Sequence, residues 1–261
     1  MSLQRRKDIA LLLSLIAACW PVWRWWLARV GDGMAWEAVS LITAIVFVTL
    51  AGRAQARKSP APAMALLLCY SIAFPFVPPL LRACLAMLTI ASLSSTLWLQ
   101  RAMHWPLCGL LLLSLPVIES LNFYIGYPLR VIVGSMAQTL INMHGFAVLR
   151  EGVALNFNGQ LIAIDAPCSG VKMLWAGLYL ACALAAFRSL STLQTAVLLA
   201  ASIFAVILGN VLRTVALFYV EAQVVTGPAW WHDAVGVAAF LGAATMVAIV
   251  GTRLLGRSYA R

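Results

Sequence analysis

The sequence predicts an all-α polytopic membrane protein, on the evidence of its composition and its long uncharged stretches. Of its 261 residues, 63% are apolar and only 10% are charged, whereas soluble domains are about 45–50% apolar and about 25% charged. A soluble fold of this length leaves about a quarter of its unfolded surface in water, too much to hide so many apolar side chains. The apolar runs are continuous and lack the alternation of outer-membrane barrel strands.

We predict about eight transmembrane helices. A helix needs about 20 residues to cross the hydrocarbon layer, and about 17 at the short end. Shorter uncharged runs can still span, because the charged side chains at their ends can sit at the interface. The predicted spans are roughly 9–27, 35–51, 61–80, 83–99, 105–123, 169–187, 191–212 and 234–252.

The distribution of charge predicts cytoplasmic N- and C-termini. With eight spans, 11 of the 18 basic residues and one of the 8 acidic residues lie inside, and the remaining 7 of each lie outside. The whole net charge of +10, which is 11 − 1, is then on the cytoplasmic side, as the positive-inside rule requires. The excess of basic residues therefore indicates a membrane topology, and we expect no nucleic-acid partner.

Residues 131–149 are also uncharged, but we predict that they do not span the membrane. A ninth crossing would move Arg188 and the basic C-terminal tail outside, against the charge bias. Apolar residues at helical spacing, with three polar residues among them, are typical of an amphipathic helix on the outer leaflet. We expect Tyr127-Pro128 to open this helix and Gly145 to close it. A short ninth span is the alternative.

Three loosely alternating segments follow, over 146–150, 153–157 and 160–164. Asn158-Gly159 separates the last two, and Asn-Gly flanked by such runs is the strongest short signal for a hairpin. We therefore predict a short water-exposed β-hairpin that leads into the sixth span. Irregular backbone at this point must lie outside the hydrocarbon or line a cavity.

The six cysteines include no C-x-x-C pair, and five of them lie in apolar runs, where Cys behaves as a small hydrophobic residue. We expect no disulfide framework, no metal site and no organic cofactor. Cys168 differs, because it stands at the start of a predicted helix beside the small residues Ser169 and Gly170. A helix N-terminus stabilises a thiolate and offers free N–H groups. An inert buried thiol is the alternative.

Two further polar residues are predicted on the outer face. Arg213 ends the seventh span, and Asn210 lies on the same helix face, which favours a polar pocket over an arginine that only reaches the interface. His232 opens the eighth span after two interfacial tryptophans; a solvated side chain is the alternative. Asp233 is expected to cap that helix rather than to orient His232, because adjacent helical residues point about 100° apart.

A Cys, an Arg and a His at one membrane depth have a common chemistry. A thiolate attacks a peptide carbonyl, a His transfers the proton, and a fixed cation stabilises the oxyanion or holds the substrate. The sequence thus predicts an outer-face site built on Cys168, Arg213 and His232.

Three motifs in this order resemble the signature blocks of the exosortase/archaeosortase family. They are Ala-Pro-Cys-Ser-Gly at 166–170, Asn-x-x-Arg at 210–213 and His-Asp-x-x-Gly at 232–236. The resemblance covers roughly residues 105–250, and the His of the third block is similar to the bacterial branch. Pro167 departs from the commoner Ala-Cys-Ser-Gly form, and Lys172 stands where Arg or a polar residue is more usual. These departures leave the subfamily open.

The resemblance implies a cysteine peptidase/transpeptidase of the bacterial inner membrane. Such a protein would cleave a C-terminal sorting signal of exported proteins, of the Pro-Glu-Pro (PEP-CTERM) type, at the outer face. Its partners would be membrane-anchored substrates, the lipid bilayer and an acceptor for transpeptidation. Residues 1–104 would form N-terminal spans, and 105–261 the catalytic core.

The resemblance also assigns roles to residues. Cys168 would be the nucleophile, His232 the general acid and base, and Arg213 the electrostatic element. The supporting or substrate-binding residues would be Ser169, Gly170, Lys172, Asn210, Asp233 and Arg130.

Other classes remain open on the residues alone. A transporter or channel for an anionic or lipid-linked glycan would use Arg213 and Lys172 to bind its cargo, although we find no inverted repeat and few charges at mid-membrane. A non-catalytic assembly component for exopolysaccharide or surface-protein export would need no single outer-face residue. A quinone-linked thiol oxidoreductase would need a pair of outer-face cysteines.

Overall fold

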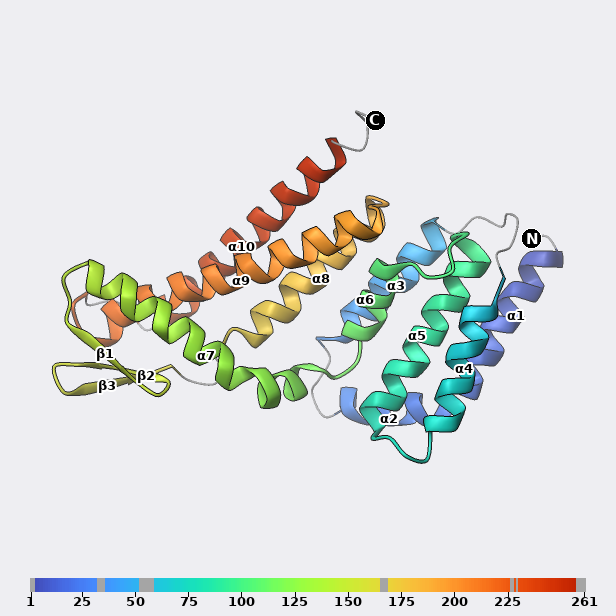
Figure 1. Ribbon diagram of the computed structural model, residues 1–261, viewed down its shortest axis with the longest axis horizontal. Helices are drawn as coiled ribbons and strands as arrows, with labels where there is room; N and C mark the ends of the chain where they lie inside the picture. The colour runs from blue at the N-terminus through green and yellow to red at the C-terminus, as the bar shows by residue number, and fades with distance from the viewer. Residues whose placement is uncertain are drawn as a thin grey trace. The chain divides into compact units, whose positions relative to one another are not determined.

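The computed structural model describes residues 3–31, 36–51, 59–164, 169–225, 228 and 230–256 (Figure 1). These residues form helices and one small sheet. The chain divides into two compact units. The first is Met1–Val117 with Ala185–Thr195, and the second is Ile118–Leu184 with Ala196–Arg261.

In the first unit, α5 packs against every other helix of the N-terminal region. Its Ala, Ser and Thr residues allow close approach, as in other membrane-helix interfaces, and the Ser95 hydroxyl donates to the carbonyl of Ala91 in its own helix. The helices are α1 (Leu3–Ala18), α2 (Trp20–Gly31), α3 (Ala38–Ala51), α4 (Ala61–Ala73), α5 (Pro79–Trp98) and α6 (Trp105–Leu113).

The second unit holds the sheet and the longest helices. Its elements are α7 (Ile118–Met143), β1 (Val148–Glu151), β2 (Ala154–Phe157), β3 (Gln160–Ala163), α8 (Val171–Phe187), α9 (Thr192–Glu221) and α10 (Trp231–Gly256), with the end of α8 and the start of α9 belonging to the first unit. Glycines bring the helices together. A Cβ on Gly177 of α8 would stand 2.7 Å from Val206 of α9, and one on Gly209 of α9 would stand 3.1 Å from the carbonyl oxygen of Ala239 of α10. Small residues of this kind allow helix backbones to pack closely.

The sheet is antiparallel, with the strand order β1-β2-β3. Asn158 and Gly159 both take positive φ, 52° and 82°, as the tight turn of a two-residue hairpin requires. The predicted hairpin is therefore confirmed, and β1 extends it to three strands. The inward face of the sheet joins the core formed by Val133, Ala137 and Ile141 of α7, Val148 and Leu155 of the sheet, and Val211, Val215 and Phe218 of α9.

Three to five membrane spans are supported by length and hydropathy among the described residues. The helices α5, α9 and α10 each qualify alone. The pair α1 and α2, bent by 69°, and the pair α6 and α7, bent by 96°, each qualify as one broken span or a re-entrant segment. The helices α3, α4 and α8 are apolar but shorter. The total of eight spans remains a prediction.

Three predicted helices differ from the structure. The first span, predicted as one helix over 9–27, is broken, because α1 ends at Ala18 and α2 begins at Trp20, with a bend of 69° between them. The fifth span, predicted as one helix over 105–123, is broken, because α6 ends at Leu113 and α7 begins at Ile118. The amphipathic segment predicted over 131–149 is not a separate helix, since α7 continues through Pro128 to Met143. Residues at helical spacing beyond the proline are buried in the core, and this packing outweighs the backbone hydrogen bond that proline removes. Gly145, with φ of 90°, follows the helix end as predicted.

Candidate functional site

The first motif is described from Ser169 onward; Cys168 and the three residues before it lie outside the described residues. Ser169 is 3% exposed, and its hydroxyl lies 3.3 Å from Asn122 Oδ1 of α7. The carbonyl of Gly170 accepts a hydrogen bond from the N–H of Leu174 at 2.8 Å, which begins the first turn of α8. The residue after Cys168 is thus held between α7 and the start of α8.

The second motif meets the first at Gly170. Asn210 of α9 is 1% exposed, and a Cβ added to Gly170 would stand 2.7 Å from its Nδ2 and 2.9 Å from its Cγ. Gly170 also has φ of 80°, which side chains rarely adopt. Both the backbone and the neighbouring amide therefore require glycine here, and the contact fixes the start of α8 against α9.

Arg213 lies one turn further along α9, on the same face as Asn210. Its Nε is buried and has no hydrogen-bond partner among the described residues. The guanidinium lies against the third motif, because a Cβ added to Gly236 of α10 would stand 3.3 Å from Nε and 3.6 Å from Cζ. A buried donor left without an acceptor costs about 1–3 kcal/mol. Such a donor can bind a carbonyl oxygen, an oxyanion or a carboxylate of a bound molecule.

His232 lies in the first turn of α10, and its side chain is exposed. It stands four residues before Gly236, so the two share one face of the helix. Arg213 therefore contacts the side of α10 that carries His232. The contacts that the structure describes bring the three motifs together in the second unit, in the order Gly170, Asn210, Arg213, Gly236 and His232.

A cavity of about 190 Å³ opens beside His232. Its walls are β3, part of β2 and the last turns of α9; the other lining residues are Leu155, Gln160, Leu161, Ile162, Ala163, Ile164, Thr214, Leu217, Phe218 and Glu221. Thr214 and Glu221 were not predicted. They were detectable in principle, because Thr214, Leu217, Phe218 and Glu221 recur at i, i+3, i+4 and i+7, the spacing of one helix face.

Three predicted supporting residues make no described contact with this site. Lys172 is exposed in the first turn of α8, and Asp233 is exposed in the first turn of α10, where a carboxylate is favourable at a helix N-terminus. Arg130 Nε donates to the carbonyl of Gly126 within α7, at 3.4 Å. Their roles remain predictions.

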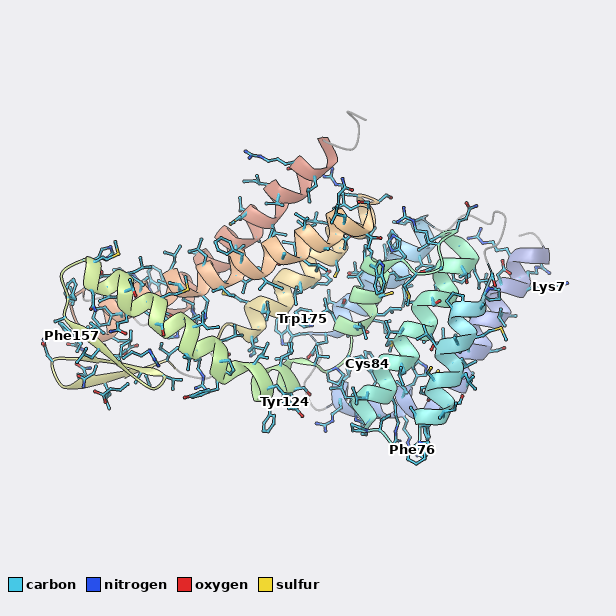
Figure 2. The ribbon with its side chains drawn as sticks, viewed as in Figure 1. Lys7, Phe76, Cys84, Tyr124, Phe157 and Trp175 are labelled. Carbon is cyan, nitrogen blue, oxygen red and sulfur yellow. The ribbon has the colours of Figure 1, made fainter. Side chains whose placement is uncertain are left out.

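Two other polar residues of the second unit, His144 and Tyr124, do not line the cavity beside His232. His144 Nδ1 lies 2.5 Å from the hydroxyl of Tyr219, and their rings stack, at the aromatic edge of the core. Tyr124 projects away from α7 (Figure 2) and is 73% exposed. Among the described residues, no group of His, Cys, Asp and Glu is arranged to hold a metal ion.

The fold and site define an α-helical membrane protein in which three polar motifs meet at helix ends beside a small sheet. The family model for transmembrane exosortases matches residues 79–249. This match covers more than half of the chain and includes all three motifs, so the chain belongs to the transmembrane exosortase family. Comparison with curated proteins and comparison with solved structures return no match.

Proposed function

We propose that this chain is a cysteine peptidase/transpeptidase of the bacterial inner membrane that cleaves a C-terminal sorting signal of exported proteins. The observation that carries the proposal is the convergence of the three motifs, with Gly170 on Asn210 and Arg213 on Gly236. These contacts join residues 40 and 23 positions apart on three different helices, and such residues would have no reason to share one cluster of polar contacts if each only satisfied its own helix.

The proposed chemistry has two halves. The Cys168 thiolate attacks the carbonyl carbon of the scissile peptide bond, and a C–S bond forms while the carbonyl oxygen becomes an oxyanion. His232 gives a proton to the leaving amine as the C–N bond breaks, which leaves a thioester. Water or an acceptor nucleophile then attacks the thioester, gives its proton to His232 and releases the thiolate.

Arg213 is the proposed electrostatic element. Its buried Nε has no hydrogen-bond acceptor in the described part of the chain. This donor is therefore suited to an oxyanion or to an acidic residue of the sorting signal. A donor that is already in place loses no energy to reorganisation when charge develops, which is the main source of oxyanion stabilisation in acyl transfer.

The membrane setting supports the proposal but is itself part of it. With eight spans and cytoplasmic termini, all three motifs lie at the outer face. A substrate anchored by its own helix would then present its scissile bond at the depth of Cys168, and this restriction to one plane supplies proximity.

The test is processing of a reporter in cells. The reporter ends in a Pro-Glu-Pro-type motif, a transmembrane helix and a basic tail, and its size is followed with the wild-type chain and with Cys168→Ala. We expect trimming with the wild type and none with the variant. Trimming that survives Cys168→Ala would remove the thiol from the mechanism. If a panel of sorting motifs is never trimmed, the peptidase proposal fails and the transporter and assembly alternatives gain.

A further inference from the structure

The outer strand of the sheet borders the cavity beside His232. All four residues of β3 line that cavity. Gln160 and Ile162 belong to one face of the sheet, and Leu161 and Ala163 to the other, because side chains alternate along a strand. Because residues of both faces line the cavity, we infer that it reaches the edge of the strand. The sheet order places nothing beyond β3, so this edge is open in the described part of the chain.

The opposite edge of the sheet, strand β1, is covered by side chains of α7. Val148 of β1 donates its N–H to Asn142 Oδ1 of α7 at 2.9 Å, and its carbonyl accepts from Gln138 Nε2 of α7 at 3.2 Å. The backbone groups of Val148 therefore point away from β2, and those of its partner Phe157 point away from β1, toward β3.

The alternating direction of backbone groups along each strand determines which N–H and C=O groups of β3 point outward. Gln160 pairs with Phe157 and Ile162 pairs with Leu155, so the backbone groups of Gln160 and Ile162 face β2. The N–H of Ile164 also reaches back to the carbonyl of Val153, at 2.9 Å. Leu161 and Ala163, between them, point their N–H and C=O groups outward. Two donors and two acceptors thus point away from β2 along a strand whose residues line the cavity beside His232.

We propose that β3 binds the sorting signal of the substrate as an added strand, through the outward backbone groups of Leu161 and Ala163. This inference rests on the proposed function, which supplies an extended peptide as the occupant. Strand addition to an open edge is a general mode of peptide binding, in which main-chain hydrogen bonds give affinity and pockets for alternate side chains give specificity. Here the pocket for alternate side chains is the cavity, with Leu217 and Phe218 on its apolar wall.

The position of β3 suits a substrate strand that leads to the reacting groups. Cys168 follows Ile164, the last cavity residue after β3, by four positions in the sequence. His232 borders the same cavity from α10. A peptide paired with β3 therefore lies beside the proposed proton-transfer residue.

A Pro-Glu-Pro segment fits such an edge. Its prolines are two residues apart, so both face the same side of an extended strand. Proline has no N–H to donate and is tolerated in a sheet only where its nitrogen faces away from the ladder. The Glu between them would face β3 with a complete pair of backbone groups, and the prolines would face outward.

The experiment removes single N–H groups from the edge. Leu161→Pro is compared with Leu161→Ala, and Ala163→Pro with Ala163→Val; each second variant changes the side chain but keeps the N–H. We expect each Pro variant to trim a reporter about tenfold more slowly than its matched variant, the size of one lost hydrogen bond. Leu149→Ala, on the exposed face of β1, should trim at the wild-type rate. Equal rates within each matched pair would overturn the proposal.

A binding measurement separates this proposal from the proposed function and from misfolding. A photoreactive residue is placed at successive positions of the sorting signal, and capture is mapped in the Cys168→Ala chain, which keeps the native strand. We expect capture within residues 160–163, at alternate reporter positions. A reporter that wild type trims but that is captured on other elements, or equally at every position, would overturn the β3 proposal and leave the peptidase proposal standing. A reporter panel that wild type never trims would count against the peptidase proposal instead.

Discussion

The guanidinium of Arg213 lies against Gly236, so closely that a Cβ on this glycine would stand 3.3 Å from Nε. The contact joins α9 to α10 at the turn that follows His232. It gives Gly236 a function in the third motif: the missing side chain leaves room for a charged group. Nε is buried and has no described hydrogen-bond partner, so packing against α10 at Gly236 sets the position of the guanidinium.

We expect Gly236→Ala to lower reporter processing by about tenfold with little effect on stability. With the new Cβ only 3.3 Å away, the guanidinium must shift by a few tenths of an ångström. A misplaced electrostatic group stabilises the transition state less, and a tenfold lower rate corresponds to a loss of about 1.4 kcal/mol. Gly242→Ala is the matched control, since it lies on the same helix with nothing within 4 Å of the new Cβ. It should process normally and gain up to about 1 kcal/mol from helix propensity. Equal processing by both variants would contradict the role given to Gly236.

Gly170→Ala should destabilise the protein much more than Gly236→Ala does. The substitution combines a positive φ of 80° with a contact of 2.7 Å to the buried amide of Asn210. The backbone term alone is about 1–2 kcal/mol. Gly152→Ala, with φ of 62° and open space around it, isolates that term. The midpoint of thermal unfolding should fall further for Gly170→Ala than for Gly152→Ala, and adding Asn210→Ala should recover part of the difference. Equal midpoints would show that the contact with Asn210 does not matter.

Arg213→Met should stabilise the protein while abolishing its activity. The substitution removes a buried donor that has no described acceptor, a group that costs about 1–3 kcal/mol, and Met and Arg have similar helix propensities. A gain of 1 kcal/mol raises the unfolding midpoint by about 2–4 °C in a chain of this size. Processing should fall by about 100-fold or more. Arg213→Lys tests whether charge alone suffices. A lower midpoint for Arg213→Met would mean that the guanidinium holds the fold rather than the substrate.

Local signals predicted local structure well. Asn158-Gly159 predicted its turn because the requirement for positive φ at both positions is a property of the dipeptide itself. Gly145 marked a helix end for the same reason. Pro128 predicted a helix start that the structure does not have, because continuation of α7 through the proline depends on its burial against the sheet and α9, which no window of sequence contains.

The sequence grouped residues of the candidate site along one helix, but it did not predict their contacts with other helices. Asn210 and Arg213 were grouped because i and i+3 share a helix face. That Asn210 packs on Gly170, and Arg213 on Gly236, depends on how α8, α9 and α10 cross, and small-residue contacts set that crossing. The cavity residues Thr214 and Glu221 were missed because four of the eleven lining residues come from β3, a strand 50 or more residues earlier in the chain.

The orientation of the chain can be tested by labelling single cysteines. In a background without the six native cysteines, Asn158→Cys places a thiol in the β2–β3 turn, and Ser189→Cys places one after α8; both positions are exposed. We expect a membrane-impermeant maleimide to label the first in intact cells and the second only after lysis, because α8 should cross between them. The reverse pattern would invert the topology, and labelling of both would mean that α8 does not span.

His104 should make stability depend on pH. It caps α6 by accepting the N–H of Leu107 on Nδ1, its ring stacks on Phe47, and it is 5% exposed. Burial, with a smaller effect from Arg101, lowers its pKa from 6.5 to about 4. Between these values the unfolded chain binds a proton at His104 that the folded chain does not bind. The contribution of His104 to the free energy of unfolding therefore falls as the pH drops from about 6.5 to about 4 and changes no further below that. The shift corresponds to about 3 kcal/mol.

The matched variant for this effect is His104→Asn, because Asn is a good N-cap with no charge to gain. Carboxylates titrate in the same range in both proteins, so the informative quantity is the difference in unfolding midpoint between wild type and variant at each pH. Loss of the stacking on Phe47 adds a constant offset to that difference. We expect the unfolding midpoint of the wild type to fall steadily relative to that of His104→Asn as the pH drops from 6.5 to 4. A difference that stays constant over this range would mean that His104 titrates normally and that its buried neutral state contributes nothing to the pH dependence.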